Sequence, residues 1–217
     1  MASTIRLDRA TILTAASDLL DQDGLDGLTM RRLATKLGVA PMATYRHFAD
    51  RAALVDALID DTASRIEIPA PTGDWRLDLK AIARSLRNGL LARPALIPVV
   101  IARPALGPAA IRLAEAAYAV LVPTGFGPRT TDRAANLLFG YVLGFVALEA
   151  PRRYPAAGAS LYASQETVQA GYAAIDPASL PFTMEVGPAA SRFVDDAQFE
   201  WGLHAALDGI QARYPGD

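Results

Sequence analysis

The sequence, 217 residues long, predicts an all-α protein made of two unequal helical parts. Apolar residues recur three and four positions apart along most of the chain, which is the spacing of one buried helix face. No stretch alternates apolar and polar residues for long enough to propose a strand. Proline and glycine interrupt the helical pattern at intervals, and so divide the chain into helices joined by turns.

Two helices are predicted at the N-terminus. Asp8 can cap the first, whose apolar stripe ends at Gly24. The second extends from about residue 30 to residue 37, between a capping Thr29 and Gly38. Glycine at that position tolerates the positive φ that closes many helices, so a tight turn is expected there.

A very short third helix and a longer fourth helix follow. Pro41 suits the first turn of the third helix, where its missing N–H costs nothing. Asp50 can cap the fourth helix, which we expect over residues 51–67. Prolines and a glycine in residues 68–73 form a natural joint between an N-terminal domain, residues 1–67, and a second domain, residues 68–217.

Most of the second domain also shows helical periodicity. Helices are expected at about residues 74–93, 109–122, 131–150 and 191–213. The helix at 131–150 is apolar on most faces, so it needs more than one packing partner. Residues 151–190 are rich in Pro, Gly, Ala and Ser, and there we expect one helix at about 165–175 within an otherwise mobile stretch.

The composition excludes several classes of function. Hydrophobic residues make up 52% of the sequence, yet no uninterrupted apolar run is long enough to cross a membrane. With no cysteine and two histidines, we expect no disulfide, no metal site, no cofactor and no catalytic residues. The start of the chain lacks the pattern of a signal peptide, so we expect a cytoplasmic protein with no membrane partner.

The charge is distributed unevenly along the chain. Residues 29–51 contain five cations and one carboxylate, giving +4, whereas the whole chain carries −2, so the remainder carries −6. A local basic patch on an acidic protein is typical of a nucleic-acid contact, although a short basic run is often only a solvated helix face.

Residues 28–48 combine the second helix, the glycine turn and the third helix at the spacing of a helix-turn-helix. Apolar residues between the two helices would hold them together: Leu33, Leu37, Val39 and Phe48. The remaining side chains are then expected to face outward: Arg31, Arg32, Ala43, Thr44, Tyr45, Arg46 and His47. Exposed aromatic and polar groups on a short helix suit contacts to base edges and phosphates in the major groove of DNA.

Motifs in this part of the chain resemble those of the TetR family of bacterial transcription regulators. They are Gly27-Leu-Thr-Met-Arg-Arg-Leu-Ala, Lys36-Leu-Gly-Val, Thr44-Tyr-Arg-His-Phe and Arg51-Ala-Ala-Leu-Val-Asp-Ala-Leu. The resemblance covers about residues 7–60. It implies an N-terminal three-helix helix-turn-helix domain plus a larger helical domain for ligand binding and dimerisation. It also implies a repressor that a small organic ligand releases from a palindromic double-stranded DNA operator.

The predicted DNA-binding residues combine the outward-facing set with the positions that the resemblance implies. They are Met30, Arg31, Arg32, Pro41, Met42, Ala43, Thr44, Tyr45, Arg46, His47 and Arg51. The helix at 51–67 would link this DNA-reading head to the ligand sensor. Residues 41–44 differ from those of the tetracycline repressor itself, so the resemblance does not imply the same operator.

The C-terminal part resembles the regulatory domain of the family more loosely, and its last helix looks like a dimerisation helix. The resemblance implies that this helix pairs with the one at 131–150 in a four-helix bundle across a two-fold axis, giving a homodimer. The residues expected at that interface are Leu138, Val142, Phe145, Phe199, Leu203, Leu207 and Ile210.

A mainly apolar pocket with a few polar groups is expected within residues 75–150. Its predicted lining is Trp75, Leu86, Val100, Arg103, Tyr118, Asn136, Tyr141 and Glu149. Most of the polar side chains that bind tetracycline in the tetracycline repressor are missing from the matching positions, so we expect a different organic molecule of medium size.

Two alternatives remain open at this point. The chain can be an activator or a DNA-binding regulator that needs no ligand. It can also be an all-α enzyme or small-molecule binding protein, but the sequence offers no phosphate loop and no convincing pair of carboxylates for such chemistry.

Overall fold

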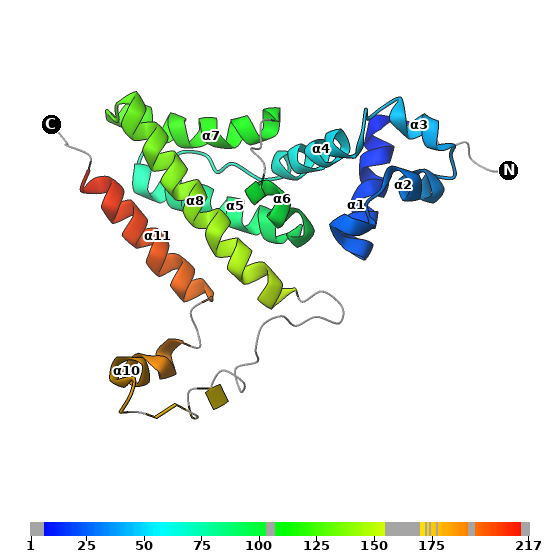
Figure 1. Cartoon of the computed structure of the whole chain (residues 1–217). Helices are drawn as coiled ribbons and strands as arrows, with labels where there is room; N and C mark the ends of the chain where they lie inside the picture. The colour runs from blue at the N-terminus through cyan, green and yellow to red at the C-terminus, as the bar shows by residue number, and fades with distance from the viewer. Residues whose placement is uncertain are drawn as a thin grey trace. The chain divides into compact units, whose positions relative to one another are not determined.

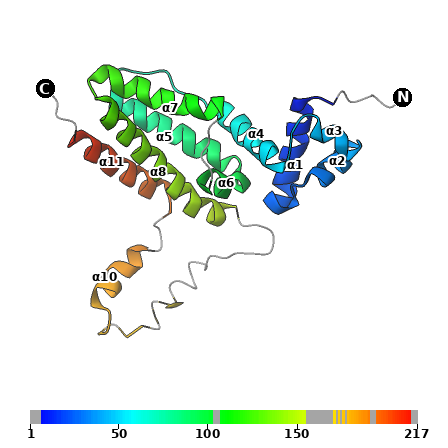
Figure 2. The same cartoon turned by 45° about the horizontal axis from the view of Figure 1, so that its top comes forward.

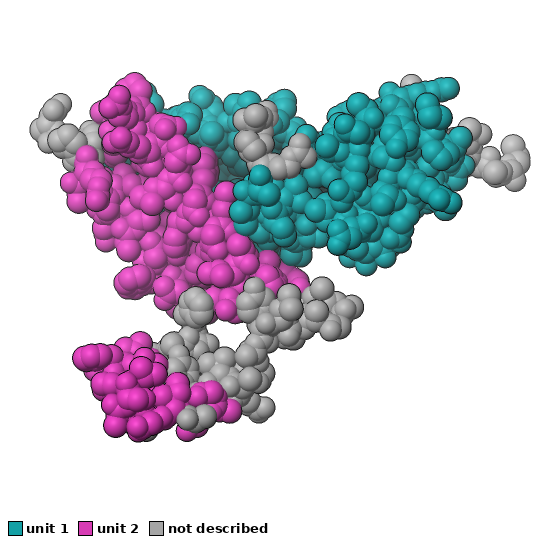
Figure 3. Space-filling model, in the orientation of Figure 1, with its two compact units in different colours: residues 1–124 teal, residues 125–217 magenta. Residues whose placement is uncertain are grey.

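The computed structural model describes residues 7–102, 107–154, 170–171, 173, 175–176, 178–190 and 194–213. Every regular element in these residues is a helix, as the sequence predicts (Figure 1). The chain divides into two compact units, residues 1–124 and residues 125–217 (Figure 3).

Four helices form the N-terminal part of the first unit: α1 (Arg9–Gly27), α2 (Met30–Leu37), α3 (Pro41–Tyr45) and α4 (Arg51–Ser64). The predicted caps are confirmed. Asp8 accepts a hydrogen bond from the Thr11 N–H at 2.8 Å, and Asp50 accepts one from the Ala53 N–H at 2.7 Å. Thr29 caps α2 in the same way, at 3.2 Å.

Two glycines with positive φ shape this part of the chain. Gly38 has a φ of 67° and ends α2, as expected. Gly24 has a φ of 68°, but it kinks α1 where the sequence predicts an end, and the helix continues to Gly27.

One hydrophobic core joins these helices to the segment that follows the joint. It contains Ile12 and Leu20 of α1, Leu33 of α2, and Leu96 and Val99 from the short helices η1 (Pro94–Leu96) and α6 (Ile97–Ala102). Because this core spans both sides of residues 68–73, the compact unit extends to residue 124. The functional division at residues 67 and 68 stays a prediction.

The proline-rich joint is fixed by Asp78 in the first turn of α5 (Trp75–Leu91). Its carboxylate accepts hydrogen bonds from the Thr72 N–H at 2.8 Å, the Thr72 hydroxyl at 2.7 Å and the Gly73 N–H at 3.3 Å. Burial by itself raises the pKa of Asp78, but these bonds outweigh it and leave the pKa below its ordinary value. The stability that this carboxylate contributes is therefore lost as the pH falls through that lowered pKa.

Helix α4 is also tied to α7 (Pro108–Leu121), which the 3-10 turn η2 (Val122–Thr124) follows. The N-cap residue of α7, Gly107, has no side chain to cap the helix. Asp60 of α4 replaces it by accepting a hydrogen bond from the Ala109 N–H at 2.8 Å. A side chain at Gly107 would clash with the Asp60 carboxylate. The close approach of α4 to α7 thus requires glycine at this position.

The second unit contains α8 (Pro128–Arg153), α10 (Pro181–Ala190) and α11 (Asp196–Gln211). Helices α8 and α11 lie side by side (Figure 2). The Tyr141 hydroxyl donates to the Phe199 carbonyl at 2.8 Å. The rings of Tyr141, Phe145 and Phe199 form an aromatic cluster with centroids 5.2 to 6.0 Å apart.

The structure corrects the expectation for residues 151–190. Helix α8 continues through Pro151 to Arg153, and α10 forms where the sequence analysis predicted no helix. Pro181 stands first in α10, where proline suits a helix, but Gly187 and Pro188 within it disguise the pattern. The helix predicted at about 165–175 falls largely outside the described residues.

Within the described residues, α8 alone is long and apolar enough to cross a membrane, with a mean hydropathy of 1.4. Nearly half of its apolar window is buried inside the protein (44%). The core helix of a globular protein has the same properties, and the packing of α8 against α11 gives it that role.

Candidate nucleic-acid interface

Helices α2 and α3 pack as a helix-turn-helix. Leu33 and Phe48 are buried in the core, and the Val39 N–H donates to the Ala34 carbonyl at 3.0 Å across the turn. The outer side of α3 carries Met42, which is 69% exposed, and Tyr45, which is 42% exposed. Large side chains on this side of so short a helix are free to enter a groove of DNA.

The predicted DNA-binding residues differ in their exposure to solvent. The exposed ones are Arg31, Arg32, Pro41, Met42, Tyr45, Arg46 and Arg51. Ala43 and His47 are partly exposed. Two are buried, Met30 at 6% exposure and Thr44 at 0%, so the expectation that Thr44 faces outward is wrong.

The reason lies in the register of α3. Thr44 is fully buried on the inner side of α3, and its hydroxyl donates to the Pro41 carbonyl at 2.8 Å. Met30, the first residue of α2, joins the hydrophobic core of the first unit. A helix of five residues gives too little periodicity to fix which side faces inward, so the sequence could not reveal this register.

The cations near this surface differ in what they bind. Arg32 pairs with Asp23 at 2.6 Å and Lys36 with Asp18 at 3.4 Å. No ion pair is described for Arg31 or Arg46 in residues 7–102. These two guanidinium groups are therefore the best placed of the predicted set for phosphate contacts.

Arg51 has a second role that the sequence does not indicate. Its Nε donates to the Leu28 carbonyl at 2.7 Å and its Nη2 to the Leu25 carbonyl at 2.6 Å. The start of α4 is thereby tied to the segment between α1 and α2. A phosphate contact by Arg51 stays a prediction, and only its remaining N–H groups are free to make it.

Arg9, the first residue of α1, also contacts the end of the helix-turn-helix. Its Nη1 donates to the His47 carbonyl at 3.0 Å, and its Cζ lies 4.2 Å from the centroid of the Phe48 ring. Nothing in the spacing of the sequence indicated this contact, because the residues are 38 positions apart.

The residues predicted for the dimer interface lie elsewhere. All belong to α8 or α11 and are buried within one chain: Leu138, Val142, Phe145, Phe199, Leu203, Leu207 and Ile210. Contact of these residues with a partner chain stays a prediction, and in the single chain little of their surface is exposed for it. An apolar stripe that packs within a chain has the same sequence pattern as one that packs against a second copy.

The residues predicted to bind a ligand are spread over both units. Leu86, Trp75, Val100 and Tyr118 lie in the first, and Arg103 falls outside the described residues. In the second, Tyr141 bonds to α11. Exposed Asn136 donates to the Asp132 carbonyl at 2.9 Å, and buried Glu149 pairs with Arg153 at 3.0 Å. Ligand binding by this set stays a prediction.

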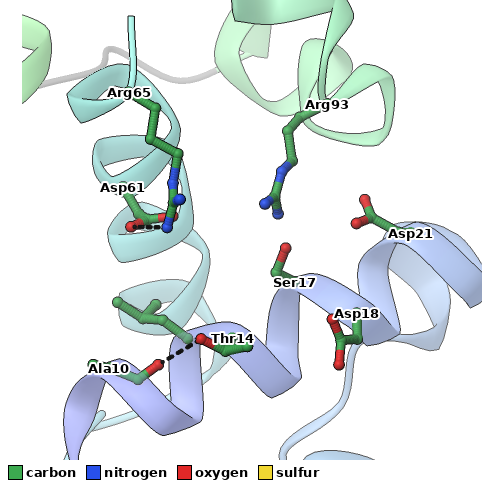
Figure 4. A pocket seen from close by; sticks show the side chains of 9 residues that line it. Ala10, Thr14, Ser17, Asp18, Asp21, Asp61, Arg65 and Arg93 are labelled. Carbon is green, nitrogen blue, oxygen red and sulfur yellow. Dashed lines mark hydrogen bonds and ion pairs between the residues drawn. The ribbon is translucent and has the colours of Figure 1, made fainter.

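A polar pocket of about 330 Å³ opens between α1, α4 and the residue before η1 (Figure 4). None of the predicted ligand-binding residues lines it. Arg65 of α4 pairs with Asp61 through two bonds of 3.0 and 3.1 Å. Arg93 points toward Ser17 of α1 (Figure 4), and its Nη1 is buried without a hydrogen-bond partner.

Removal of the Arg93 guanidinium is expected to leave the free energy of unfolding unchanged or to raise it. A buried donor without an acceptor costs about 1–3 kcal/mol, so Arg93→Met should raise the free energy of unfolding by up to about 1 kcal/mol. Urea unfolding measures this. The matched variant Arg65→Met, which breaks an exposed ion pair, should lower the free energy of unfolding by less than about 0.5 kcal/mol. A loss above about 1 kcal/mol in Arg93→Met would mean that this guanidinium is satisfied in solution.

Comparison with protein families gives two matches along the chain. Residues 12–58 match the family of "Bacterial regulatory proteins, tetR family", and residues 68–214 match "Tetracyclin repressor-like, C-terminal domain". The first match contains α2 and α3, and the second covers more than half of the chain.

Relatives and solved structures agree with these matches. The chain is 33% identical to the tetracycline repressor protein class A from transposon 1721 of Escherichia coli, over 96% of the chain and 92% of the relative. It is 30% identical to an HTH-type transcriptional regulator of Saccharopolyspora erythraea, over 94% and 87%. The structure of the Streptomyces coelicolor TetR family protein ActR in complex with actinorhodin superposes with a TM-score of 0.86, at 27% identity, covering 97% of this chain and all of that one (100%).

Proposed function

The chain belongs to the TetR family of transcription regulators, and from this premise we propose that it acts as a homodimeric repressor of a palindromic operator. Members of the family regulate transcription and are not enzymes, and the chain is a ligand-responsive DNA-binding regulator.

The observation that carries the proposal is the outer side of the helix-turn-helix. Met42 and Tyr45 are exposed on α3, while Thr44 of the same helix and Phe48, which follows it, are buried. A rigid helix with exposed aromatic and apolar side chains can read base edges in the major groove. Arg31 and Arg46 flank it with exposed positive charge that phosphates can neutralise.

An exposed apolar stripe in the second unit supports a dimer. Leu137, Gly140, Gly144 and Leu148 follow one side of α8 and are all exposed. Trp201 of α11 is 68% exposed. Added Cβ atoms at Gly140 and Gly144 would meet nothing within 4 Å in one chain. These glycines are therefore not needed for packing inside the protomer. Close approach of a partner backbone would account for glycine at both positions.

A two-fold axis through this stripe would bury the same surface on both chains, as an isologous dimer requires. Two DNA-reading heads would then meet two half-sites, and the operator would be palindromic. The structurally similar protein ActR forms a complex with actinorhodin. We propose an organic molecule of medium size as the effector of this chain, which would act in the cytoplasm, where its operator is accessible.

Selection of DNA by the wild-type protein tests the proposed function. From a randomised duplex library we expect a palindromic consensus. Its two half-sites should lie one helical turn apart, about 34 Å, or a multiple of that distance. If Arg31 and Arg46 of two protomers each neutralise one phosphate, the plot of log K against log salt should have a slope of about −3.6. Enrichment of no sequence, or binding that is insensitive to salt, would contradict the proposal.

A further inference from the structure

The C-terminal end of α3 is held by a residue from another helix. Arg9 donates from Nη1 to the His47 carbonyl at 3.0 Å, and its guanidinium carbon lies 4.2 Å from the centre of the Phe48 ring. His47 and Phe48 are the residues that follow the last turn of α3, and both of their N–H groups donate to the Thr44 carbonyl at 3.1 Å. Arg9 thus contacts the chain at the point where α3 ends.

Helix α3 needs such support because of its length. It has five residues, and its N-cap, Ala40, makes no side-chain hydrogen bond. An isolated helix of this size is not stable in water, so its orientation depends on tertiary contacts. The carbonyls at its C-terminal end have no partners within the helix, and a cation placed there is favourable.

The two contacts of Arg9 act together. Phe48 is buried in the core and cannot move independently of it. The hydrogen bond fixes the neighbouring His47 carbonyl with respect to α1, and the guanidinium over the ring adds a cation–π attraction. The end of α3 is therefore connected to α1 through Arg9 as well as through the core.

We propose that Arg9 is a positioning residue for DNA recognition, which holds the end of α3 so that Tyr45 and Met42 face the groove, and which does not itself neutralise a phosphate. The inference rests on the proposed function of the helix-turn-helix. It assigns to α1 an indirect part in recognition, exerted through the position of α3, that the contacts of α2 and α3 alone do not supply.

Three variants test this role. Arg9→Met keeps a stem over Phe48 but removes the charge and the hydrogen bond. Arg9→Lys keeps the charge and a donor. Arg112→Met is the matched control, because it makes the same change at an exposed position on α7. The probe is the duplex that the wild-type protein enriches from a randomised library, and affinity is measured over a series of salt concentrations.

Arg9→Met is expected to weaken binding about tenfold with an unchanged salt slope, because no phosphate contact is lost. Arg9→Lys should recover most of that loss, and Arg112→Met should bind as the wild type does. Wild-type affinity in Arg9→Met would overturn the inference. So would a salt slope reduced by about 0.9 for each protomer, since this would identify Arg9 as a phosphate contact.

Amide hydrogen exchange provides a readout that needs no DNA. In Arg9→Met the N–H groups of His47 and Phe48 should exchange at least about tenfold faster, and those of α11 should not change. Unchanged exchange at the end of α3 would overturn the positioning role even if DNA binding fell. Failure of the wild-type protein to bind any duplex would instead contradict the proposed function, and leave the exchange result as the measure of the contact.

Discussion

Tyr45→Ala is expected to weaken operator binding strongly at physiological salt while the protein stays folded and dimeric. Tyr45 is exposed on the outer side of α3, so its removal leaves no cavity and should change the free energy of unfolding by less than about 0.5 kcal/mol. A contact to a base or phosphate is worth about 1–3 kcal/mol, and it counts twice in a dimer. The expected loss of affinity is therefore about a hundredfold or more.

Two further variants separate the parts of this effect. Tyr45→Phe removes the hydroxyl alone and should lose about tenfold if that group bonds to a phosphate. Tyr154→Ala removes another exposed tyrosine, 47% exposed at the end of α8, and should bind DNA as the wild type does. Fluorescence anisotropy with the selected duplex measures all three. Tight, sequence-specific binding by Tyr45→Ala would show that α3 does not enter the groove as proposed.

Gly144→Arg is expected to convert the dimer into a folded monomer. In one chain a side chain at this position meets open space, so the protomer can accommodate the change. Across a two-fold interface the same side chain would overpack two helices, at a cost of about 1–3 kcal/mol for each copy. We expect the dissociation constant of the dimer to rise about a hundredfold or more, and DNA affinity to fall with it.

Sedimentation velocity measures the change, and Gly127→Arg is the matched control. Gly127 is the N-cap of α8 and also has open space around it, but it does not lie on the stripe of Gly140 and Gly144. Gly144→Ala tests the interface by whether it strengthens or weakens the dimer. On a free helix surface alanine stabilises by about 1 kcal/mol relative to glycine. If the stripe is an interface, alanine should instead weaken the dimer, and a stabilised dimer would rule this surface out.

The residues predicted for the dimer interface lie on helix faces that are already buried in one chain. In α8 and α11 the most apolar stripes, which include Leu138 and Leu203, are buried inside one chain. The stripe left exposed contains Gly140 and Gly144, which a search for large apolar residues passes over. Hydrophobicity identifies residues that avoid water, but it does not say which surface covers them.

The contacts of Arg9, Arg51 and Asp60 could not be predicted for a related reason. Each joins residues that are distant in the sequence, and each ends on a backbone group: the carbonyls of His47 and Leu28, and the N–H of Ala109. A backbone group has the same chemistry at every position of the chain. No residue pattern can therefore mark the partner before the helices are packed.

The sequence by itself determined the all-α class, the caps and turn of the helix-turn-helix, and the family, because each depends on neighbours within a few positions along the chain. The tertiary structure alone decided that Thr44 faces the core, that the stripe of Leu138 is internal, and that Arg9 reaches the end of α3. Those outcomes depend on which helix faces meet. Several faces of a mostly apolar helix can be buried at similar free energy, so only the packing of the whole chain selects among them.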